Sequence, residues 1–288
     1  MKIITTFNQQ NTKFVGLTAA LTYIEPSTLV WLPTQKPAFD MFDEMNPDLL
    51  FCSSEDFSSD LIMALKEYKT PVVVLGLNFP SNIQPKLVCV NDLPQQILDN
   101  ISVPYYKLLP AANSAQFNSH FLDPVIDEKY QSDVFYLSTT SPQQNPEILK
   151  ILEQVCMQTD LKIKFAGPQH LPFAQYVGQA SIKHLVSFIK SAKITIDCTH
   201  NHWLDIAYNK SFCLSSVPLE YYPSFNSYKE LFEQMTHFLD DEQHRSHYIK
   251  KAYNYAKHNT YFHRLGDIFK LLDMSELSEK SFNKAEQI

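Results

Sequence analysis

Polar residues gather where a buried strand is expected to end in the second half of the chain. His200, Asn201 and His202 follow the apolar run Lys193–Cys198, and Asp205 comes three residues later. In an open α/β sheet such a loop lies at the carboxyl end of a strand, where ligands bind. A carboxylate there could accept hydrogen bonds from the two hydroxyl groups of a ribose, or it could cap a helix. The sequence leaves both roles open.

A run of hydroxyl residues follows another apolar segment of this half. Ser138, Thr139 and Thr140 come at the end of Asp133–Ser138, ahead of a helical pattern over Pro146–Met157. Hydroxyls and backbone amides before a helix can hold a phosphate group, because the helix N-terminus carries unpaired N–H donors. An ordinary polar loop has the same composition, so this role is also open.

Polar residues follow strands expected in the first half as well. Asn8 and Gln9 follow the first apolar run, and Glu55 and Asp56 follow Pro47–Cys52. A carboxylate in such a place could take a proton from a reacting hydroxyl group. Acidic residues are also typical of the start of a helix, where the dipole stabilises them.

The sequence contains few residues at a spacing that would bind a metal ion. His200 and His202 form an H-x-H pair, but no carboxylate or cysteine lies at a convincing second spacing. The chain contains no D-x-D motif, and the acidic run Asp240–Glu242 is typical of a helix cap. Asp197 and Asp205 have the separation of an E-x7-E pair, but Asp197 lies inside an expected strand. We therefore expect no metal site and no bound cofactor.

Short apolar runs alternate with helical patterns along the chain, which favours parallel sheets with crossover helices. In the first half, strands are expected at Lys2–Phe7, Thr28–Leu32, Pro47–Cys52, Pro71–Gly76 and Lys86–Val90. In the second half they are expected at Asp133–Ser138, Ile163–Gly167, Ala174–Gly178, Lys193–Cys198 and Ser211–Ser216.

The stretch from Tyr106 to Gln131 breaks this rhythm. It carries Pro110 and Pro124 and has no clear period. We therefore predict a first domain over residues 1–113, an irregular connection over 114–131 and a second domain over 132–257. Residues 258–288 are predicted to form a helix that crosses back to the first domain, with a polar tail that frays after Met274.

The length, net charge and cysteine content of the chain limit its possible partners. The chain has 288 residues, a net charge of −7 and a pI of about 5.8. Bulk nucleic-acid binding is disfavoured, because it needs a dense basic surface; a modified DNA base as a substrate is not excluded. The five cysteines include no C-x-x-C pair and read as small buried hydrophobic residues. We expect no signal peptide and no membrane span, and a cytoplasmic protein.

An ordered series of short motifs covers roughly Lys107 to Leu272. The series runs Leu109–Ala112, Pro124, Asp133–Ser138, Leu161–Gly167, Ala174–Gly178, His184–Leu185, Trp203–Ala207, and His258, Thr260, Tyr261 and Arg264. It resembles the nucleotide-sugar half of a GT-B glycosyltransferase, closest to the compact spore-maturation-type (glycosyl transferase group 1-like) branch. The sequence departs from that pattern in having Ser138 and Lys210 where the family has glycine, Asp205 where it has glutamate, and no arginine soon after Ser138.

The resemblance implies an α/β protein of the GT-B class, with two Rossmann-like domains whose parallel sheets face across a cleft. It implies metal-independent sugar transfer from a nucleotide-sugar donor to a glycan, a protein or a modified DNA base. The donor would be held by Ser138, Thr139, Thr140, Gly167, Val177, His200, Asn201, His202 and Asp205. Asn8 and Gln9 would lie on the acceptor side, with Glu55 or Asp56 as the catalytic base. Two alternatives stay open: a catalytically lapsed nucleotide-sugar or glycan-binding protein, and a nucleotide-sugar epimerase of the same fold.

Overall fold

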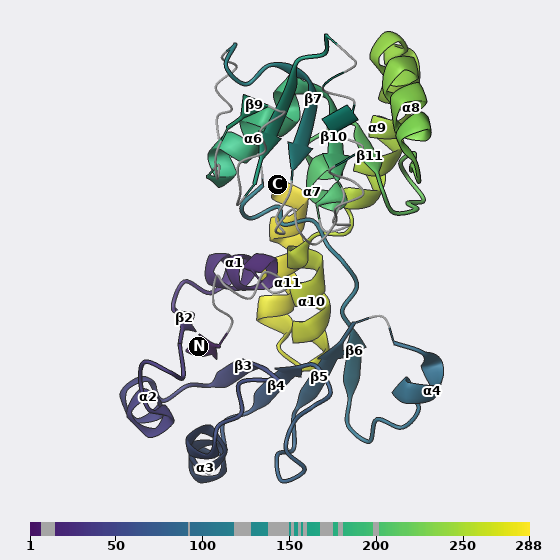
Figure 1. The fold of residues 1–288 in the computed structure, drawn as a ribbon. Coiled ribbons are helices and arrows are strands. Elements are labelled where there is room, and N and C mark those ends of the chain that lie inside the picture. Colours follow the sequence, from purple (N-terminus) through teal and green to yellow (C-terminus); the bar gives the residue numbers. More distant parts are fainter. Residues whose placement is uncertain are drawn as a thin grey trace. The chain divides into compact units, whose positions relative to one another are not determined.

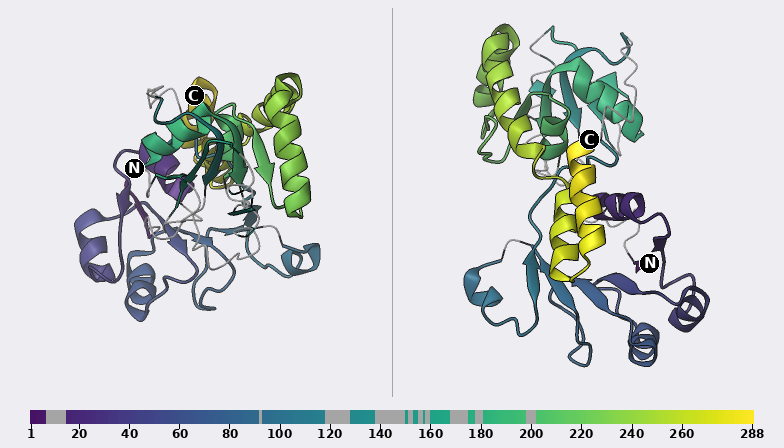
Figure 2. Two further views of the ribbon diagram at one scale, coloured as in Figure 1. Left: turned by 45° about the horizontal axis from the view of Figure 1, so that its top comes forward. Right: turned by 180° about the vertical axis from the view of Figure 1, so that it is seen from behind.

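The chain divides into two compact units in a computed structural model. Unit 1 comprises Met1–Ala111 and Thr260–Ile288, and unit 2 comprises Ala112–Asn259 (Figures 1 and 2). The structure describes residues 1–6, 15–91, 93–117, 128–137, 150, 153–154, 157, 160–167, 175–177, 181–197 and 202–288.

Unit 1 is built on a parallel sheet of six strands. Their order is β2-β1-β3-β4-β5-β6, with bounds β1 Ile3–Thr5, β2 Leu29–Val30, β3 Leu49–Ser53, β4 Val72–Leu75, β5 Leu87–Val90 and β6 Tyr105–Lys107. Its helices are α1 Val15–Ile24, α2 Ala38–Met45, α3 Ser59–Tyr68, α4 Gln95–Leu98, α10 Tyr261–Leu271 and α11 Ser275–Gln287. All the residues of β3, β4 and β5 are buried, as expected for central strands covered on both faces.

The two faces of this sheet are covered by different helices (Figure 1). Leu50 and Cys52 join the hydrophobic core formed with α2 and α3. Phe51, which points the opposite way, lies edge-on to Phe269 of α10 at 6.3 Å between ring centroids. Helix α10, from the C-terminal segment, therefore packs on the face of this sheet opposite to α2 and α3.

The tail after Met274 does not fray, so that prediction was wrong. Residues Ser275–Gln287 form α11, whose Leu277, Ser281 and Ala285 are buried at helical spacing. Gly266 of α10 has no Cβ, and the Phe282 ring packs where that atom would be. Gly266 leaves room for this ring, and a residue that matters by being small gives little hydrophobic signal in a sequence.

Strand β6 was also missed, because most of its residues fall in the stretch from Tyr106 to Gln131, which shows no clear period. It is a short edge strand, paired only to β5, with exposed ends at Tyr105 and Lys107. Edge strands of this length lack the continuous apolar run that marks a buried strand.

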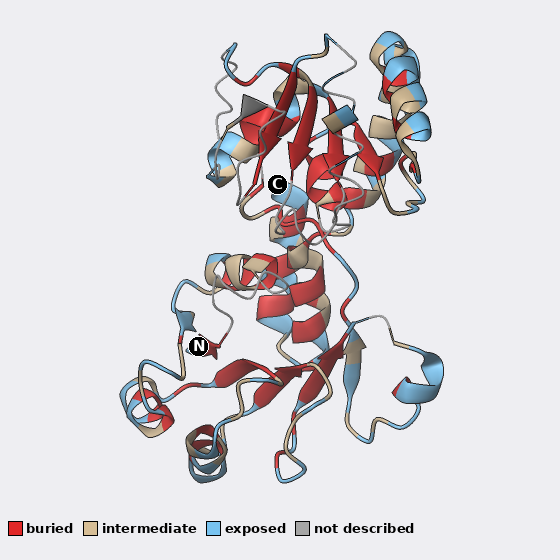
Figure 3. Ribbon diagram, in the orientation of Figure 1, coloured by how far each residue is buried: buried red, intermediate tan, exposed pale blue. Residues whose placement is uncertain are grey.

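Unit 2 is built on a second parallel sheet, of order β11-β10-β7-β8-β9. Its strands are β7 Ser132–Leu137, β8 Ile163–Ala166, β9 Gln175–Tyr176, β10 Ala192–Asp197 and β11 Cys213–Ser215. Its helices are α6 Ile182–Ser191, α7 Trp203–Tyr208, α8 Tyr228–Asp240 and α9 Glu242–Ala256. The central strands of both sheets are buried (Figure 3).

Two predicted caps begin the last helices of unit 2. The Ser227 hydroxyl accepts the N–H of Glu230 at the start of α8, and the Asp241 carboxylate accepts the N–H of His244 at the start of α9. These caps satisfy backbone donors that have no partner inside the helix. Across the part of the chain that the structure describes, no helix combines the length and apolar character needed to cross a membrane.

Candidate donor site

The carboxyl ends of the unit 2 strands lie in one row across the sheet. Asp197 of β10 pairs with Leu137 of β7 and with Ser215 of β11, and Leu137 pairs with Ala166 of β8. These strand ends therefore form one edge of the sheet. Such an edge is where ligands bind in open α/β sheets.

Four residues of the predicted donor set fall within the described structure, and all lie along or next to this edge. Gly167 follows β8 and is buried, and the N–H of Val177 after β9 donates to Phe165 at 2.9 Å. His202 immediately precedes α7, and Asp205 lies in the first turn of that helix. Ser138, Thr139, Thr140, His200 and Asn201, and the acceptor-side residues Asn8 and Gln9, lie outside the described residues.

His202 is held between two carboxylates. Its backbone N–H donates to Asp197 Oδ2 at 3.0 Å, and its ring Nδ1 lies 3.3 Å from Asp205 Oδ2. The side chains are largely enclosed, with 17% of His202 and 8% of Asp205 exposed. Asp197, at the end of β10, is fully buried. Its contact with the backbone N–H of His202 holds the chain where it enters α7.

The charges of this cluster favour a protonated histidine. Burial by itself lowers the pKa of His202, but the hydrogen bond to Asp205 and the negative charges of Asp205 and Asp197 outweigh it, so the pKa is raised above its ordinary value. The cluster thus holds a buried imidazole that keeps its proton more readily than a free histidine.

Asp205 has a second partner that the sequence did not indicate. The N–H of Asn113 donates to Asp205 Oδ1 at 2.7 Å. Asn209, one turn after Asp205, donates through Nδ2 to the carbonyl oxygen of Phe117 at 2.6 Å. Asn113, predicted to end the first domain, and Phe117, predicted to lie in the irregular connection, therefore both contact α7 or the residue after it. The only sequence signal for these contacts was the polar character of the stretch, which does not identify a partner.

Aromatic rings fix α7 from its other side. Trp203 stacks on Tyr255 of α9 at 5.9 Å and on Tyr221 at 5.9 Å, with interplanar angles of 17° and 13°. Tyr221 and Tyr255 stack on each other at 4.4 Å. Since Trp203 adjoins His202, this stack anchors the first turn of the helix that carries Asp205.

The two acidic candidates of unit 1 lie in the turn after β3. Glu55 is exposed and Asp56 is half-buried, and the N–H of Asp56 donates to the carbonyl oxygen of Ser53 at 3.1 Å. Neither acid begins a helix, because α3 starts at Ser59 and is capped by the Ser58 hydroxyl. The alternative structural role as helix-start residues is thus excluded for both.

Two residues of the motif in the closing helix, Thr260 and Arg264, make structural contacts within unit 1. Arg264 is buried and donates to the carbonyl oxygens of Leu109 at 3.3 Å and Pro110 at 3.2 Å. Thr260 caps α10 through a capping box with His263, a partner that the sequence did not predict. The Arg264 hydrogen bonds hold α10 against Leu109 and Pro110, near the end of the segment Met1–Ala111.

Comparison with solved structures gives the fold. A glycosyltransferase from Rickettsia africae superposes with a TM-score of 0.67 at 11% identity, over 94% of this chain and 98% of that one. The HepE protein of Anabaena, in complex with UDP and glucose, superposes with a TM-score of 0.60 at 10% identity, over 99% and 100%. A putative UDP-N-acetylglucosamine 2-epimerase from Listeria monocytogenes superposes with a TM-score of 0.59 at 9% identity, over 94% and 96%. No model of a protein family matches the chain, and no curated protein matches it by sequence.

The chain has the GT-B fold. Two parallel-sheet α/β units, each with its own core, are the architecture that the resemblance implied. The assignment to the spore-maturation branch of GT-B proteins stays a prediction.

The backbone conformation at Lys210 bears on one departure from the family pattern. Lys210, which stands where the resemblance places a glycine, has a φ of 56°, in the left-handed region that glycine adopts without cost. The turn between α7 and β11 is therefore kept although the glycine is not. Lys210 precedes β11, and its Nζ lies 4.7 Å from the centre of the Tyr253 ring. It therefore lies at the amino edge of the sheet.

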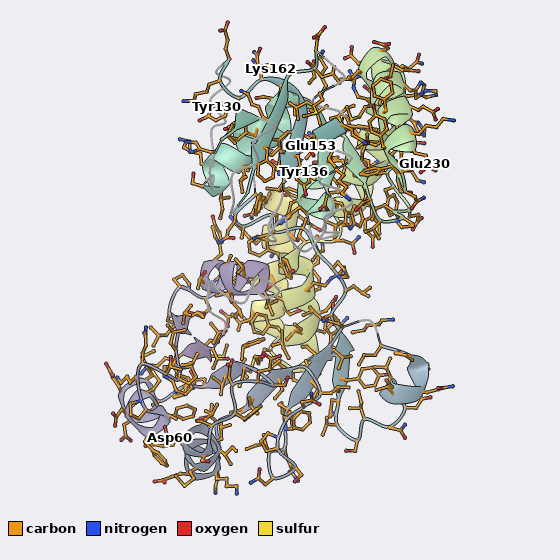
Figure 4. The ribbon with its side chains drawn as sticks, in the orientation of Figure 1. Asp60, Tyr130, Tyr136, Glu153, Lys162 and Glu230 are labelled. Carbon is orange, nitrogen blue, oxygen red and sulfur yellow. The ribbon has the colours of Figure 1, made fainter. Side chains whose placement is uncertain are left out.

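A cavity of about 450 Å³ also lies at this amino edge. It is lined by Gln131, Ser132, Asp133, Lys162, Lys190, Ser191 and Lys193. Figure 4 labels Lys162 at this end of the sheet and Tyr136 farther along β7. The lining residues of the cavity lie at the starts of β7, β8 and β10, so the cavity is at the opposite end of the strands from the donor-side edge.

Proposed function

We propose that this GT-B protein is a glycosyltransferase whose donor is a UDP-sugar. The observation that carries the proposal is the His202 ring held by Asp205 at the carboxyl edge of the second sheet. UDP is the first candidate, because the Anabaena structure named above contains UDP and a Staphylococcus aureus structure with UDP superposes with a TM-score of 0.60 at 12% identity.

The reaction transfers a sugar without a redox step. The bond between the anomeric carbon and the diphosphate oxygen breaks, and a bond forms between that carbon and an acceptor oxygen. The acceptor proton passes to a carboxylate, for which Glu55 and Asp56 are the candidates. The nucleoside diphosphate leaves with an added negative charge on its terminal phosphate.

His202 is the residue that we assign to the departing diphosphate. A protonated imidazole can donate a charge-assisted hydrogen bond to a phosphate oxygen, and such bonds are stronger than those between neutral groups. Its Nδ1 side is engaged by Asp205, which leaves Nε2 to donate to the donor. Electrostatic stabilisation of developing charge by a prearranged group is a large part of many rate enhancements.

We assign Asp205 two roles, which are to bind the ribose of the donor and to position His202. A carboxylate offers about four lone-pair sites, of which Asn113 and His202 take up two in the structure. The remaining sites are the ones that could accept the diol. Asp205 would then position His202 and hold the donor at once.

The test is a binding and turnover series on the full chain. Thermal shift with UDP, GDP, ADP, CMP and their sugars identifies the base, and calorimetry then measures affinity for the best ligand. His202→Gln should weaken binding of the diphosphate and leave binding of the nucleoside unchanged. The matched control is His247→Gln, an exposed histidine of α9 outside the donor edge, which should bind as the wild type does. If His202→Gln binds the diphosphate as tightly as the control, the assignment fails.

An epimerase is the second candidate, and the likeness to the Listeria protein favours it. The two functions differ in what happens without an acceptor. Incubation with UDP-N-acetylglucosamine alone gives an isomerised nucleotide sugar for an epimerase. Transfer to an added acceptor, with no isomer, supports the glycosyltransferase. Tight binding with neither outcome would mean a nucleotide-sugar-binding protein that has lost turnover.

A further inference from the structure

Two histidines and an aspartate meet at the turn between α8 and α9. His237 lies in the last turn of α8, Asp241 caps α9 and His244 lies in its first turn. One possible ligand atom from each residue lies within 4.8 Å of the other two. We propose that His237, Asp241 and His244 form a binding site for a divalent transition-metal ion such as Zn²⁺.

The aspartate is already set in place for this role. Asp241 Oδ1 accepts the N–H of His244 at 2.9 Å, so the helix end fixes the direction of the carboxylate. Asp241 Oδ2 lies 2.9 Å from Nδ1 of His244. A carboxylate whose direction is already fixed by a hydrogen bond loses less conformational freedom when a metal binds. Residues that hydrogen-bond to metal ligands orient them in this way in known metal sites.

The second histidine is what distinguishes the cluster from an ordinary cap. Asp241 and His244 alone would account for a capped helix. The His237 ring also lies 5.4 Å from the His244 ring, between centroids, at an interplanar angle of 55°. Both histidines are exposed, so their rings can turn toward a common point without unpacking a core.

The donor set selects the class of ion. Two imidazole nitrogens and one carboxylate suit Zn²⁺, Ni²⁺ or Cu²⁺, whereas Mg²⁺ and Ca²⁺ prefer oxygen ligands alone. Bonds of about 2.0–2.1 Å to Zn²⁺ require the ligand atoms to approach one another more closely than the 4.8 Å limit. Small side-chain rotations supply that approach, and water completes the coordination.

This site would be structural and separate from sugar transfer. It joins the end of α8 to the start of α9, and α9 packs on α7 through the stack of Trp203 and Tyr255. Bound metal should therefore raise the thermal stability of unit 2. The sequence alone does not indicate the site, because the acidic run Asp240–Glu242 is also typical of a helix cap.

The experiment uses the full chain without a histidine tag, first stripped with EDTA and then dialysed. Calorimetric titration with ZnCl₂ should give one site per chain. His237→Ala and His244→Ala should each weaken Zn²⁺ binding by about tenfold or more, the loss already seen when only an outer partner of a ligand is removed. Asp241→Asn should also weaken it, while asparagine still caps the helix.

His247→Ala is the matched control, because His247 is exposed on the same helix but lies outside the cluster. It should bind Zn²⁺ as the wild type does. Far-ultraviolet circular dichroism without metal checks that every variant folds. No saturable Zn²⁺ binding, binding that survives His237→Ala together with His244→Ala, or an equal loss in His247→Ala would each overturn the proposal.

Discussion

The substitution Asp205→Asn tests the charge cluster at the donor-side edge most directly. It keeps the size of the side chain and leaves an amide oxygen to accept the Asn113 N–H. It removes the negative charge beside His202. Because burial alone lowers the pKa of His202, and the Asp205 hydrogen bond and charge are the largest causes that raise it, the pKa should fall in the variant.

The magnitude follows from the bond that is lost. A hydrogen bond to a charged group contributes roughly 1.5–3 kcal/mol. The free energy of unfolding should fall by about that amount at a pH where His202 is protonated, and the pKa of His202 should fall as well. Both side chains are less than a fifth exposed, so solvent screening reduces this value only modestly.

The sign of the pH dependence is fixed by the direction of the shift. A histidine whose pKa is raised on folding stabilises the folded state fully below its unfolded pKa of about 6.5, and that stabilisation is lost as the pH rises through the folded pKa. The difference in unfolding free energy between wild type and Asp205→Asn should therefore be larger at pH 5.5 than at pH 8.5, values that bracket about 6.5.

Two measurements check this reasoning. Nuclear magnetic resonance titration of the His202 Cε1–H gives the pKa in each protein, and urea unfolding at the two pH values gives the stability difference. Asp240→Asn, which removes an exposed carboxylate of α8, is the control. An unchanged His202 pKa, or a stability loss equal at both pH values, would refute the cluster as described.

Three further predictions follow from other parts of the chain. Gly266→Ala should destabilise unit 1 by about 1–3 kcal/mol, because the new Cβ would lie 2.7 Å from the Phe282 ring. In a Phe282→Ala background the same change should instead stabilise by roughly 0.8–1 kcal/mol, the intrinsic helix preference; urea unfolding that shows no change of sign would contradict the α10–α11 packing. Thr260→Ala should cost about 0.5–2 kcal/mol through the lost α10 cap, and Thr260→Ser should recover most of it in thermal unfolding, so a serine variant as unstable as the alanine one would count against the cap. Sugar transfer should survive EDTA with little loss, since the chain has no D-x-D motif; activity abolished by the chelator and restored by Mn²⁺ would rule out the proposed mechanism.

The sequence alone predicted most of the strands, because a strand buried on both faces reads as a continuous apolar run. β4 and β5 lie within the predicted runs, and β3, β7 and β10 overlap theirs, each extending one residue beyond. Local capping signals were also sufficient at Ser227 and Asp241, because each acts over three residues. The order of these elements, with the resemblance in the second half, indicated the GT-B fold that the comparisons show.

Contacts between distant residues were decided only by the tertiary structure. Nothing in the sequence links Asn113 to Asp205, which are far apart in the chain and meet through a backbone N–H that every residue but proline carries. The α11 helix was missed for a related reason, since Ser281 and Gly266 matter by being small where another helix approaches. Apolar periodicity reports which side of an element is buried, and it carries no record of what buries it. The sequence therefore determined the elements and the edge that holds the candidate residues, and the packed structure determined their partners.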